Sequence, residues 1–187
     1  MIPVLLDGPA LEPLSLAEAK VWLKVDGPED DDLIRALIVA ARLMVEAEIG
    51  QVLMAQNWRL IGDSWTAGEA IEVNPGPVLA VVGARVFDAS GQSVSIPVAS
   101  FSVLVREQGA AILASQRPAP GRSHGGIEID VRLGYGEAIA SVPENIRLAI
   151  RRLVALWYDN RGEGADPDQG LPPQIRALLR PYRRLRL

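Results

Sequence analysis

The stretch from Asp30 to Gly50 is the segment around which we expect the rest of the chain to be organised. Its apolar residues recur every three or four positions on two adjoining sides, which predicts an α-helix buried over most of its circumference. Acidic residues at its start complement the helix dipole, and Gly50 suits a left-handed cap at its end. Only a narrow polar stripe remains, formed by Arg35, Arg42 and Glu46. Such a helix is either central to its domain or also packs against a neighbouring copy.

Helical spacing also marks three other segments. A capping box at residues 15–18, with serine first and glutamate three positions later, predicts a short helix over residues 16–25. A second apolar stripe with a period near 3.6 predicts a helix over residues 143–160. Two consecutive prolines then precede a last short helix, expected over residues 174–179.

Between Val52 and about Tyr135 the apolar period changes from 3.6 to 2, which predicts β-strands. The clearest strand is Ile127 to Leu133, where apolar and charged residues alternate. Residues 117–126 are rich in proline and glycine and predict an exposed, irregular loop. Further strands are expected over residues 57–61, 70–73, 78–87, 101–105 and 111–114.

This order of elements predicts an α+β fold, namely a small helical bundle with an inserted antiparallel β-sheet region and an extended C-terminal tail. A chain of 187 residues is long enough for one well-buried core. We expect residues 1–171 to form a single domain, with helices over about 15–50 and 142–161 and the β insertion over about 52–136. Residues 172–187 are expected to form a basic docking tail.

The composition narrows the chemistry that the chain can perform. There is no cysteine, which excludes thiol nucleophiles, cysteine zinc sites and disulfides, and the single histidine is His124. No apolar run reaches the length of about 18 residues expected of a transmembrane helix. The N-terminal residues have no positive region of the kind that begins a secretory signal. We therefore expect a soluble protein that is made in a cytoplasm.

Three candidate sites have simpler structural explanations. The acidic group from Asp26 to Asp32 lacks the alternating spacing of a calcium loop and fits helix capping. His124 lies among glycines without a diagnostic nucleophile or carboxylate, so a hydrolase has little support. Gly134-Tyr135-Gly136 resembles a dinucleotide-binding loop, but Ile139 stands where the third glycine belongs. We therefore assign no catalytic, metal-binding or cofactor-binding residue.

Charge is unevenly distributed along the chain. The formal net charge is −4, but residues 174–187 contain five arginines and no acid, which leaves about −9 for the rest. Such a tail either neutralises phosphates, as in a small nucleic-acid-binding module, or pairs with carboxylates of a partner protein. Interleaved leucines favour the protein partner, because a docked segment uses apolar anchors. The candidate partner-binding residues are Arg176, Leu178, Leu179, Arg180, Tyr182, Arg183, Arg184, Leu185 and Arg186.

Four stretches of the sequence, in this order, resemble the head-tail connector (adaptor) proteins of long-tailed bacteriophages and of the gene transfer agents derived from them. They are SLAEAKVWLKV, DDDLIRALIVAARLMVEAEIG, QVLMAQNW and LGYGEAIASVPENIRLAIRRLVALWYDNR. The resemblance covers both ends of the folded body and skips most of the β region. Its most specific part is the spacing of Gly134-Tyr135-Gly136, Val142-Pro143, Ala149, Tyr158 and Arg161.

The resemblance implies a non-enzymatic ring subunit of a particle neck, with about twelve copies beneath the portal vertex. Such a ring extends the channel, and double-stranded DNA passes through it without sequence-specific binding. The implied partners are the portal protein and a neck stopper or tail terminator protein, and the implied location is the particle, after assembly in the host cytoplasm. The basic end is expected to reach the portal. In the ring, Arg35, Arg42 and Glu46 are expected to face the adjacent subunit.

If apolar anchors carry the docking of the basic tail, Leu178→Asp combined with Leu185→Asp is expected to abolish binding to the portal protein while every arginine is kept. Co-sedimentation of the full-length variant with portal particles measures this. Docking that survives the double substitution would show that electrostatic attraction alone suffices.

Overall fold

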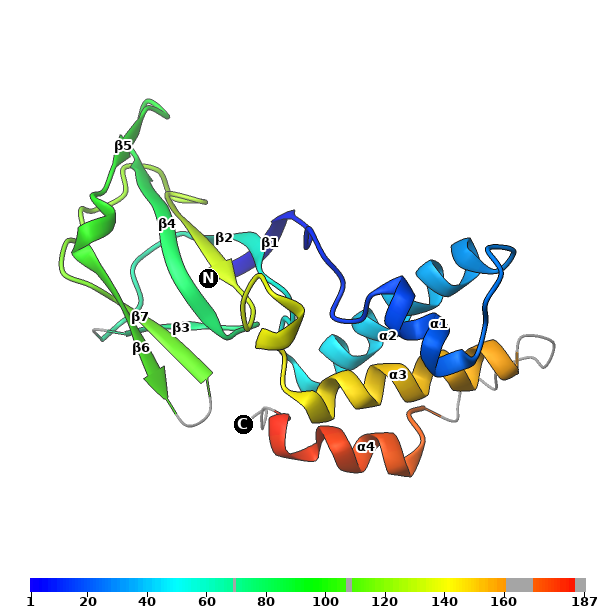
Figure 1. Cartoon of the computed structure of the whole chain (residues 1–187). Helices are drawn as coiled ribbons and strands as arrows, with labels where there is room; N and C mark the ends of the chain where they lie inside the picture. Colours follow the sequence, from blue (N-terminus) through cyan, green and yellow to red (C-terminus); the bar gives the residue numbers. More distant parts are fainter. Residues whose placement is uncertain (69, 107–108, 161–169, 184–187) are drawn as a thin grey trace. The chain divides into compact units, whose positions relative to one another are not determined.

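The chain folds into two compact units in a computed structural model. Residues 1–10 and 55–135 contain the strands and are called here the β unit (Figure 1). Residues 11–54 and 136–187 contain the four α-helices and are called the helical unit. The α+β fold and the inserted antiparallel sheet region are therefore confirmed. The structure describes residues 1–68, 70–106, 109–160 and 170–183.

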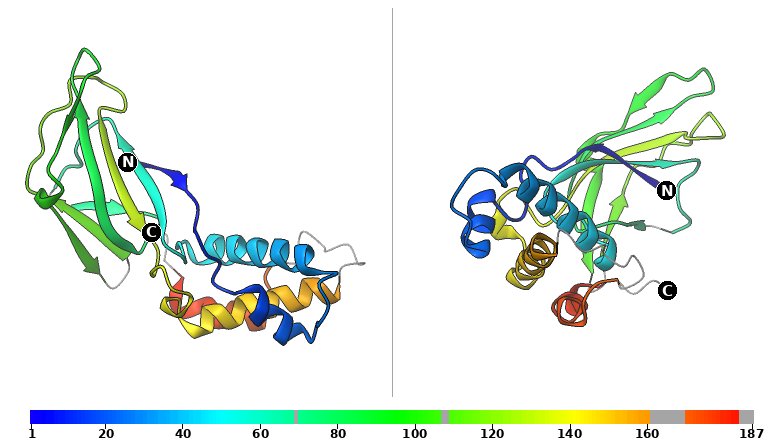
Figure 2. Two further views of the ribbon diagram at one scale, coloured as in Figure 1. Left: turned by 45° about the horizontal axis from the view of Figure 1, so that its top comes forward. Right: turned by 90° about the vertical axis from the view of Figure 1, so that its right-hand side faces the viewer.

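The helical unit is built from α1 (Leu16–Leu23), α2 (Asp31–Ile49), α3 (Glu144–Asp159) and α4 (Pro173–Leu179). Helix α3 lies between α2 and α4, and α1 contacts both α2 and α3 (Figure 2). Two short 3-10 turns, Ile139–Ser141 and Arg180–Tyr182, precede α3 and follow α4. None of the helices in the described ranges is long and apolar enough to cross a membrane.

The helix pair α2 and α3 forms the core of this unit. Ile34 and Ile38 on α2 and Ile146 and Ile150 on α3 are each at most 2% exposed. Their spacing of four residues places each pair on one face of its helix. Burial of one such side chain contributes about 1.5–3 kcal/mol, so these contacts supply much of the stability of the unit.

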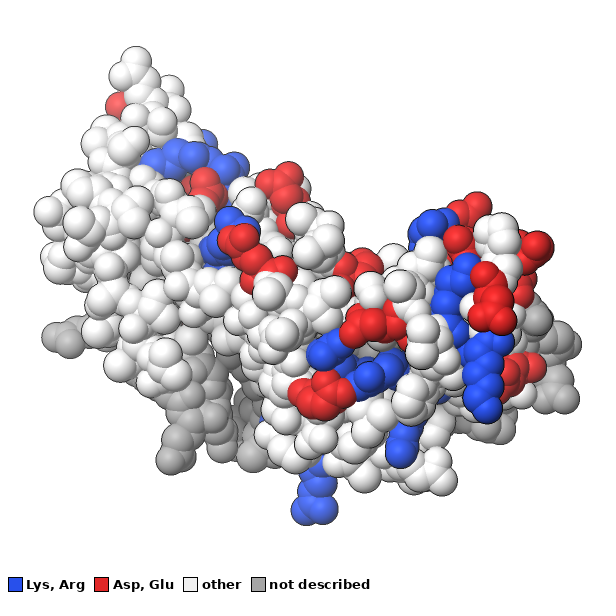
Figure 3. Space-filling model, in the orientation of Figure 1, with Lys and Arg blue, Asp and Glu red and all other residues white. Residues whose placement is uncertain are grey.

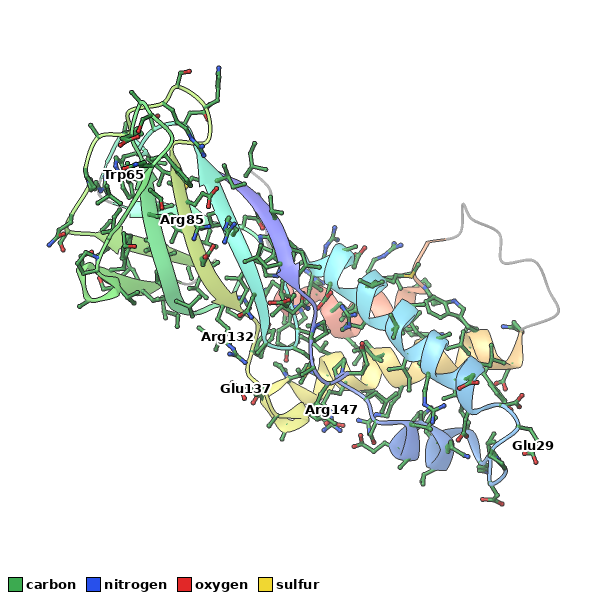
Figure 4. The ribbon with its side chains drawn as sticks, turned by 90° about the horizontal axis from the view of Figure 1, so that it is seen from above. Glu29, Trp65, Arg85, Arg132, Glu137 and Arg147 are labelled. Carbon is green, nitrogen blue, oxygen red and sulfur yellow. The ribbon has the colours of Figure 1, made fainter. Side chains whose placement is uncertain are left out.

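Helix α1 begins with the predicted capping box. The Ser15 hydroxyl accepts a hydrogen bond from the Glu18 backbone N–H at 3.2 Å, and the Ser15 backbone N–H donates to the Glu18 carboxylate at 3.1 Å. That second bond, assisted by the Ser15 hydroxyl and by Arg147, lowers the pKa of Glu18. Arg147 of α3, labelled in Figure 4, also donates to Glu18 at 2.6 Å and to the Pro13 carbonyl oxygen at 3.3 Å. The cap therefore also ties α1 to α3.

The β unit contains two antiparallel sheets, one of five strands in the order β1-β2-β8-β4-β5 and one of three strands in the order β3-β7-β6. The first sheet is formed by β1 (Ile2–Asp7), β2 (Gln56–Gly62), β8 (Ile127–Leu133), β4 (Val78–Phe87) and β5 (Ser93–Ser95). The second sheet is formed by β3 (Ala70–Val73), β7 (Gly109–Ala114) and β6 (Phe101–Arg106), with a 3-10 turn at Val98–Ser100 before β6.

Strand β8 is central to the larger sheet, because it pairs with β2 on one side and with β4 on the other. Ile127, Ile129, Val131 and Leu133 are fully buried, and the charged residues between them point to the opposite face. The alternation predicted from the sequence is therefore confirmed. It fixes the register of the sheet, because a slip of one residue would turn the whole apolar set towards solvent.

The loop after β7 is irregular, as predicted, but it is fastened to the larger sheet. The Gly121 N–H donates to the Phe87 carbonyl oxygen at 2.8 Å, and the Phe87 N–H donates to the Gly126 carbonyl oxygen at 2.9 Å. The Arg122 guanidinium lies 3.8 Å from the centre of the Phe87 ring, and Trp65 Nε1 donates to a backbone oxygen of the same loop. The predicted exposed loop is thus held by specific contacts.

The C-terminal segment contains the short helix that the sequence predicts. Residues 173–182 are helical, and Ile175 and Leu179 are buried in the helical unit. Gln51 Nε2 donates to the Tyr182 carbonyl oxygen at 2.6 Å, which fastens the end of this segment beside the end of α2. Apolar residues at helical spacing explain this packing, because burying them requires a helix placed on the bundle. The docking role of residues 172–187 stays a prediction.

Gly121→Ala is expected to destabilise the β unit by about 1–3 kcal/mol. A Cβ at this position would lie 2.3 Å from the Ala89 backbone nitrogen and 2.6 Å from the Asp88 carbonyl carbon, so the loop must move away from β4. Chemical denaturation measures the effect. Gly8→Ala in the same unit is the matched control, because a Cβ there meets nothing within 4 Å. Equal stabilities for the two variants would contradict the tight contact.

Candidate assembly surfaces

The histidine loop does not assemble a catalytic or metal site among the described residues. His124 is 90% exposed, and its Nδ1 lies 3.5 Å from Asp63 Oδ2. The Gly125 N–H donates to Asp63 at 2.7 Å and, with His124, lowers the pKa of that carboxyl. Within the described ranges, no group of three or more His, Asp or Glu side chains is placed to hold a metal ion.

The C-terminal segment presents arginines outward and leucines inward. Arg176, Arg180 and Arg183 are exposed, whereas Leu179 is fully buried against the helical unit. Arg176 donates to the Leu171 carbonyl oxygen at 3.2 Å, and Arg183 Nε lies 3.5 Å from a Glu48 carboxylate oxygen. The exposed face of this segment is therefore basic.

The partner-binding residues predicted from the sequence separate into three groups. The exposed arginines just named and the half-buried Leu178 and Tyr182 are accessible to a partner. Leu179 is fully buried in the core of its own unit, and its role as a docking anchor stays a prediction. The remaining predicted positions, Arg184, Leu185 and Arg186, lie outside the described residues.

Arg42 of α2 is a buried cation held between two carboxylates. Its Nε donates to Glu12 at 2.7 Å and its Nη1 donates to Glu46 at 2.9 Å. The other oxygen of Glu46 accepts the Leu53 N–H at 2.9 Å. The side chains of Arg42 and Glu46 are only 8% and 14% exposed. This cluster, called here the Arg42 network, joins the segment before α1, helix α2 and the chain that leaves α2.

Burial and pairing act in opposite directions on this network. Burial raises the pKa of Glu46, and the Leu53 N–H and Arg42 oppose that rise. Burial alone would lower the pKa of Arg42, but its hydrogen bonds and charge interactions with Glu12 and Glu46 raise it overall. Because a guanidinium and a backbone N–H both donate to Glu46, we infer that this carboxylate is ionised at neutral pH. The network is stable only as a complete set.

The three residues predicted to face an adjacent subunit are not equivalent. Arg35 is 56% exposed and pairs with Asp32 of its own helix at 2.7 Å. Arg42 and Glu46 point into the helical unit and are occupied there. The three residues therefore differ in exposure within one chain, and their contact with an adjacent subunit stays a prediction. Of the three, Arg35 alone has a largely exposed side chain.

The other side of α2 is apolar and exposed. Leu43 is 54% exposed, Met44 41%, and Val39 38%. Alanines lie beside the large residues on this side of the helix. The full set, called here the outer face of α2, comprises Leu33, Ala36, Val39, Ala40, Leu43, Met44 and Ala47. Within one chain this side of α2 is uncovered, and packing against a neighbouring copy stays a prediction.

A second apolar surface lies on α1. Val21 is 81% exposed and Trp22 44%, although both are large and apolar. The Arg151 guanidinium of α3 lies 5.6 Å from the centre of the Trp22 ring. Together these side chains border a shallow hollow of about 620 Å³. This hollow, called here the α1 groove, is lined by Ala17, Glu18, Val21, Trp22, Lys24 and Arg151.

The charged face of the larger sheet is nearly self-neutralised. Arg59 of β2 donates to both oxygens of Asp130 at 2.6 and 3.0 Å, and Arg85 of β4 donates to Glu128 at 2.7 Å. Arg59 also lies 3.5 Å from Glu128, so the four charges alternate across three strands. Space-filling and side-chain views show positive and negative groups in contact here (Figures 3 and 4). The sequence showed the acids of β8 but not their partners, which come from strands distant in sequence.

Edge strand β1 adds exposed apolar surface to the β unit. Ile2 is 69% exposed, Leu5 48% and Leu6 41%. The strand pairs with β2 alone in the described structure, so its outer backbone edge is open. An apolar open edge is typical of a strand covered by another chain.

The fold matches solved structures over its full length. One chain from the neck of an empty gene transfer agent particle, determined with six-fold symmetry, superposes with a TM-score of 0.82 at 23% identity. A chain from the virion of a native gene transfer agent particle superposes with a TM-score of 0.80 at 24% identity. A chain from the neck of a native particle, determined with twelve-fold symmetry, superposes with a TM-score of 0.76 at 24% identity. Each match covers 100% of this chain and 97% of the other. No protein-family model matches the sequence, and no curated protein does.

Arg42→Met is expected to destabilise the protein by about 3 kcal/mol at neutral pH, because it leaves Glu46 buried without its cation. The measurement is urea denaturation, with Arg35→Met as the control on the same helix. That control removes an exposed charge and is expected to change stability by less than about 0.5 kcal/mol.

The same variant has a defined pH dependence. Loss of Arg42 raises the folded-state pKa of Glu46 further, so the folded variant takes up a proton at a pH where the unfolded chain remains ionised. The difference in the free energy of unfolding between wild type and the Arg42→Met variant should therefore shrink as the pH falls from 7 towards about 5. A deficit that is constant over this range would show that Glu46 is not the group left unpaired.

Proposed function

We propose that this protein is a structural subunit of the neck of a tailed bacteriophage or gene transfer agent particle. The observation that carries the proposal is the full-length fold match, because it includes the helical bundle, the inserted sheets and the C-terminal helix together. In this role the subunit is a head-tail connector, or adaptor, that forms a ring under the portal and extends the DNA channel. It acts by assembly and not by catalysis.

The exposed surfaces support a role in assembly. Apolar side chains cover the outer face of α2, the α1 groove and the open edge of β1. A protein that remains monomeric rarely exposes contiguous apolar surface of this extent, since such surface marks contact sites for other chains. The twelve-fold symmetry reported for one matching neck supports a ring of twelve copies for this protein too.

The distribution of charge supports different roles for the basic C-terminal segment and for the acidic remainder of the chain. Exposed arginines of the C-terminal segment suit fixed contacts with carboxylates of the portal protein. The remainder of the chain is net acidic, which favours the passage of DNA because phosphates are not held. The stopper or tail terminator protein would then contact another surface of the ring. The protein is made in the host cytoplasm and remains in the finished particle.

Combined substitution of Arg176, Arg180 and Arg183 by glutamine tests this function. We expect the full-length wild type to bind portal particles and form a ring visible by electron microscopy, and the triple variant to bind at least tenfold more weakly. The chain should still fold, because the three side chains are exposed.

The matched control replaces the same three arginines by lysine, which keeps the charge but removes bidentate geometry. Loss of portal binding in both variants supports recognition of carboxylates by arginine. Absence of portal binding by the wild type at every salt concentration would refute the connector role. Steeply salt-dependent binding to duplex DNA that the lysine variant retains would instead favour the nucleic-acid-binding module.

A further inference from the structure

We propose that the outer face of α2 in one copy packs into the α1 groove of the next copy, and that this contact links subunits into the ring. The inference rests on the proposed function and names the two surfaces that the ring would use. Both surfaces belong to the helical unit. The contact therefore requires no particular arrangement of the β unit.

The outer face of α2 has the form of a helix–helix contact surface. Its exposed residues recur at spacings of three and four, so they form one continuous stripe. Leu43 and Met44 project from the stripe, whereas Ala36, Ala40 and Ala47 allow a second backbone to approach closely. A stripe of this kind is ordinarily buried in a folded protein. In this chain no described element covers it.

The α1 groove has the complementary form. Its volume of about 620 Å³ can receive several large side chains, and its walls are mainly apolar. Trp22 offers a broad face, backed by Arg151. Tryptophan and arginine are the residue types that most often dominate the binding energy of protein contacts. A projecting pair such as Leu43 and Met44 fits a hollow of this composition.

A second copy is the occupant that the two surfaces favour. A ring is built from heterologous contacts, in which two different patches of one subunit meet those of its neighbours. The helical unit displays two such patches, one projecting and one hollowed. A contact of α2 with α2 would be self-complementary and would stop at a dimer.

The charges around the two patches are also complementary. Asp32 and Arg35 flank the N-terminal end of the outer face, and Glu18 and Lys24 border the groove. The groove also contains Arg151, so the outer face brings one acid and one base and the groove one acid and two bases, and opposite charges can pair across the contact. This assigns Arg35 to the rim of the contact.

Disulfide crosslinking tests the contact directly, because the natural chain contains no cysteine. The variant carries Val21→Cys and Leu43→Cys, two exposed positions whose replacement should leave the fold intact. Under mild oxidation over a series of protein concentrations, we expect covalent multimers extending beyond the dimer. Each single variant should give at most a small amount of dimer. The control pair, Leu43→Cys with Val105→Cys, places the second thiol on a β-unit residue that is also 81% exposed.

A yield of covalent multimers that is clearly higher in the test pair than in the control pair supports the contact. Equal yields in the two pairs, or a nearly complete dimer from Leu43→Cys alone, would overturn it. Added to the test pair, Ala40→Asp with Met44→Asp should reduce the covalent multimers at least tenfold, whereas Leu104→Asp with Val105→Asp should not. Portal binding is scored separately. If the chain binds the portal but does not form crosslinked multimers, this contact is refuted and the neck function stands. If the chain forms the multimers but does not bind the portal, the contact stands and the neck function is refuted.

Discussion

The pairing of Arg42 with Glu12 and Glu46 is the interaction on which the helical unit depends. Helix α2 has apolar residues on both sides, so burial of apolar area alone does not decide which side turns inward. A buried guanidinium is tolerated only where carboxylates meet it at hydrogen-bonding distance. The positions of Glu12 before α1 and of the Leu53 N–H after α2 therefore fix the rotation of the helix. Polar pairing here supplies specificity, and apolar burial supplies stability.

The rotation has a direct consequence for function. With Ile34, Ile38 and Val45 turned inward, Leu43 and Met44 remain on the surface. A helix with a single apolar side would leave a polar exterior and a soluble monomer. This helix instead has one apolar side in its own core and a second apolar side that is exposed. The same logic applies to β1, whose apolar residues are not covered within the described chain.

In the β unit the main constraint is the pairing of charged residues on one face of the larger sheet. Its larger sheet has one apolar face and one face on which arginines from β2 and β4 meet acids from β8. Each bridge alone adds little at a solvent-accessible site, but the alternating set leaves little uncompensated charge. The loop fastened at Gly121 closes one end of this sheet.

Local pattern determined much of this fold from the sequence. The period of apolar residues gave the helices and strand β8, since side-chain direction follows directly from backbone geometry. The capping box at Ser15 was equally local. The sequence also placed an accessible basic surface near the C-terminus, through Arg176, Arg180 and Arg183.

Tertiary structure decided what depends on partners distant in the chain. Glu12 turns Arg42 inward across 30 residues, the helical unit buries Leu179, and Arg59 and Arg85 reach β8 only through strand pairing. Whether an apolar side chain belongs to a core or to an assembly surface is set by what packs against it, and its period along the chain is the same in both cases.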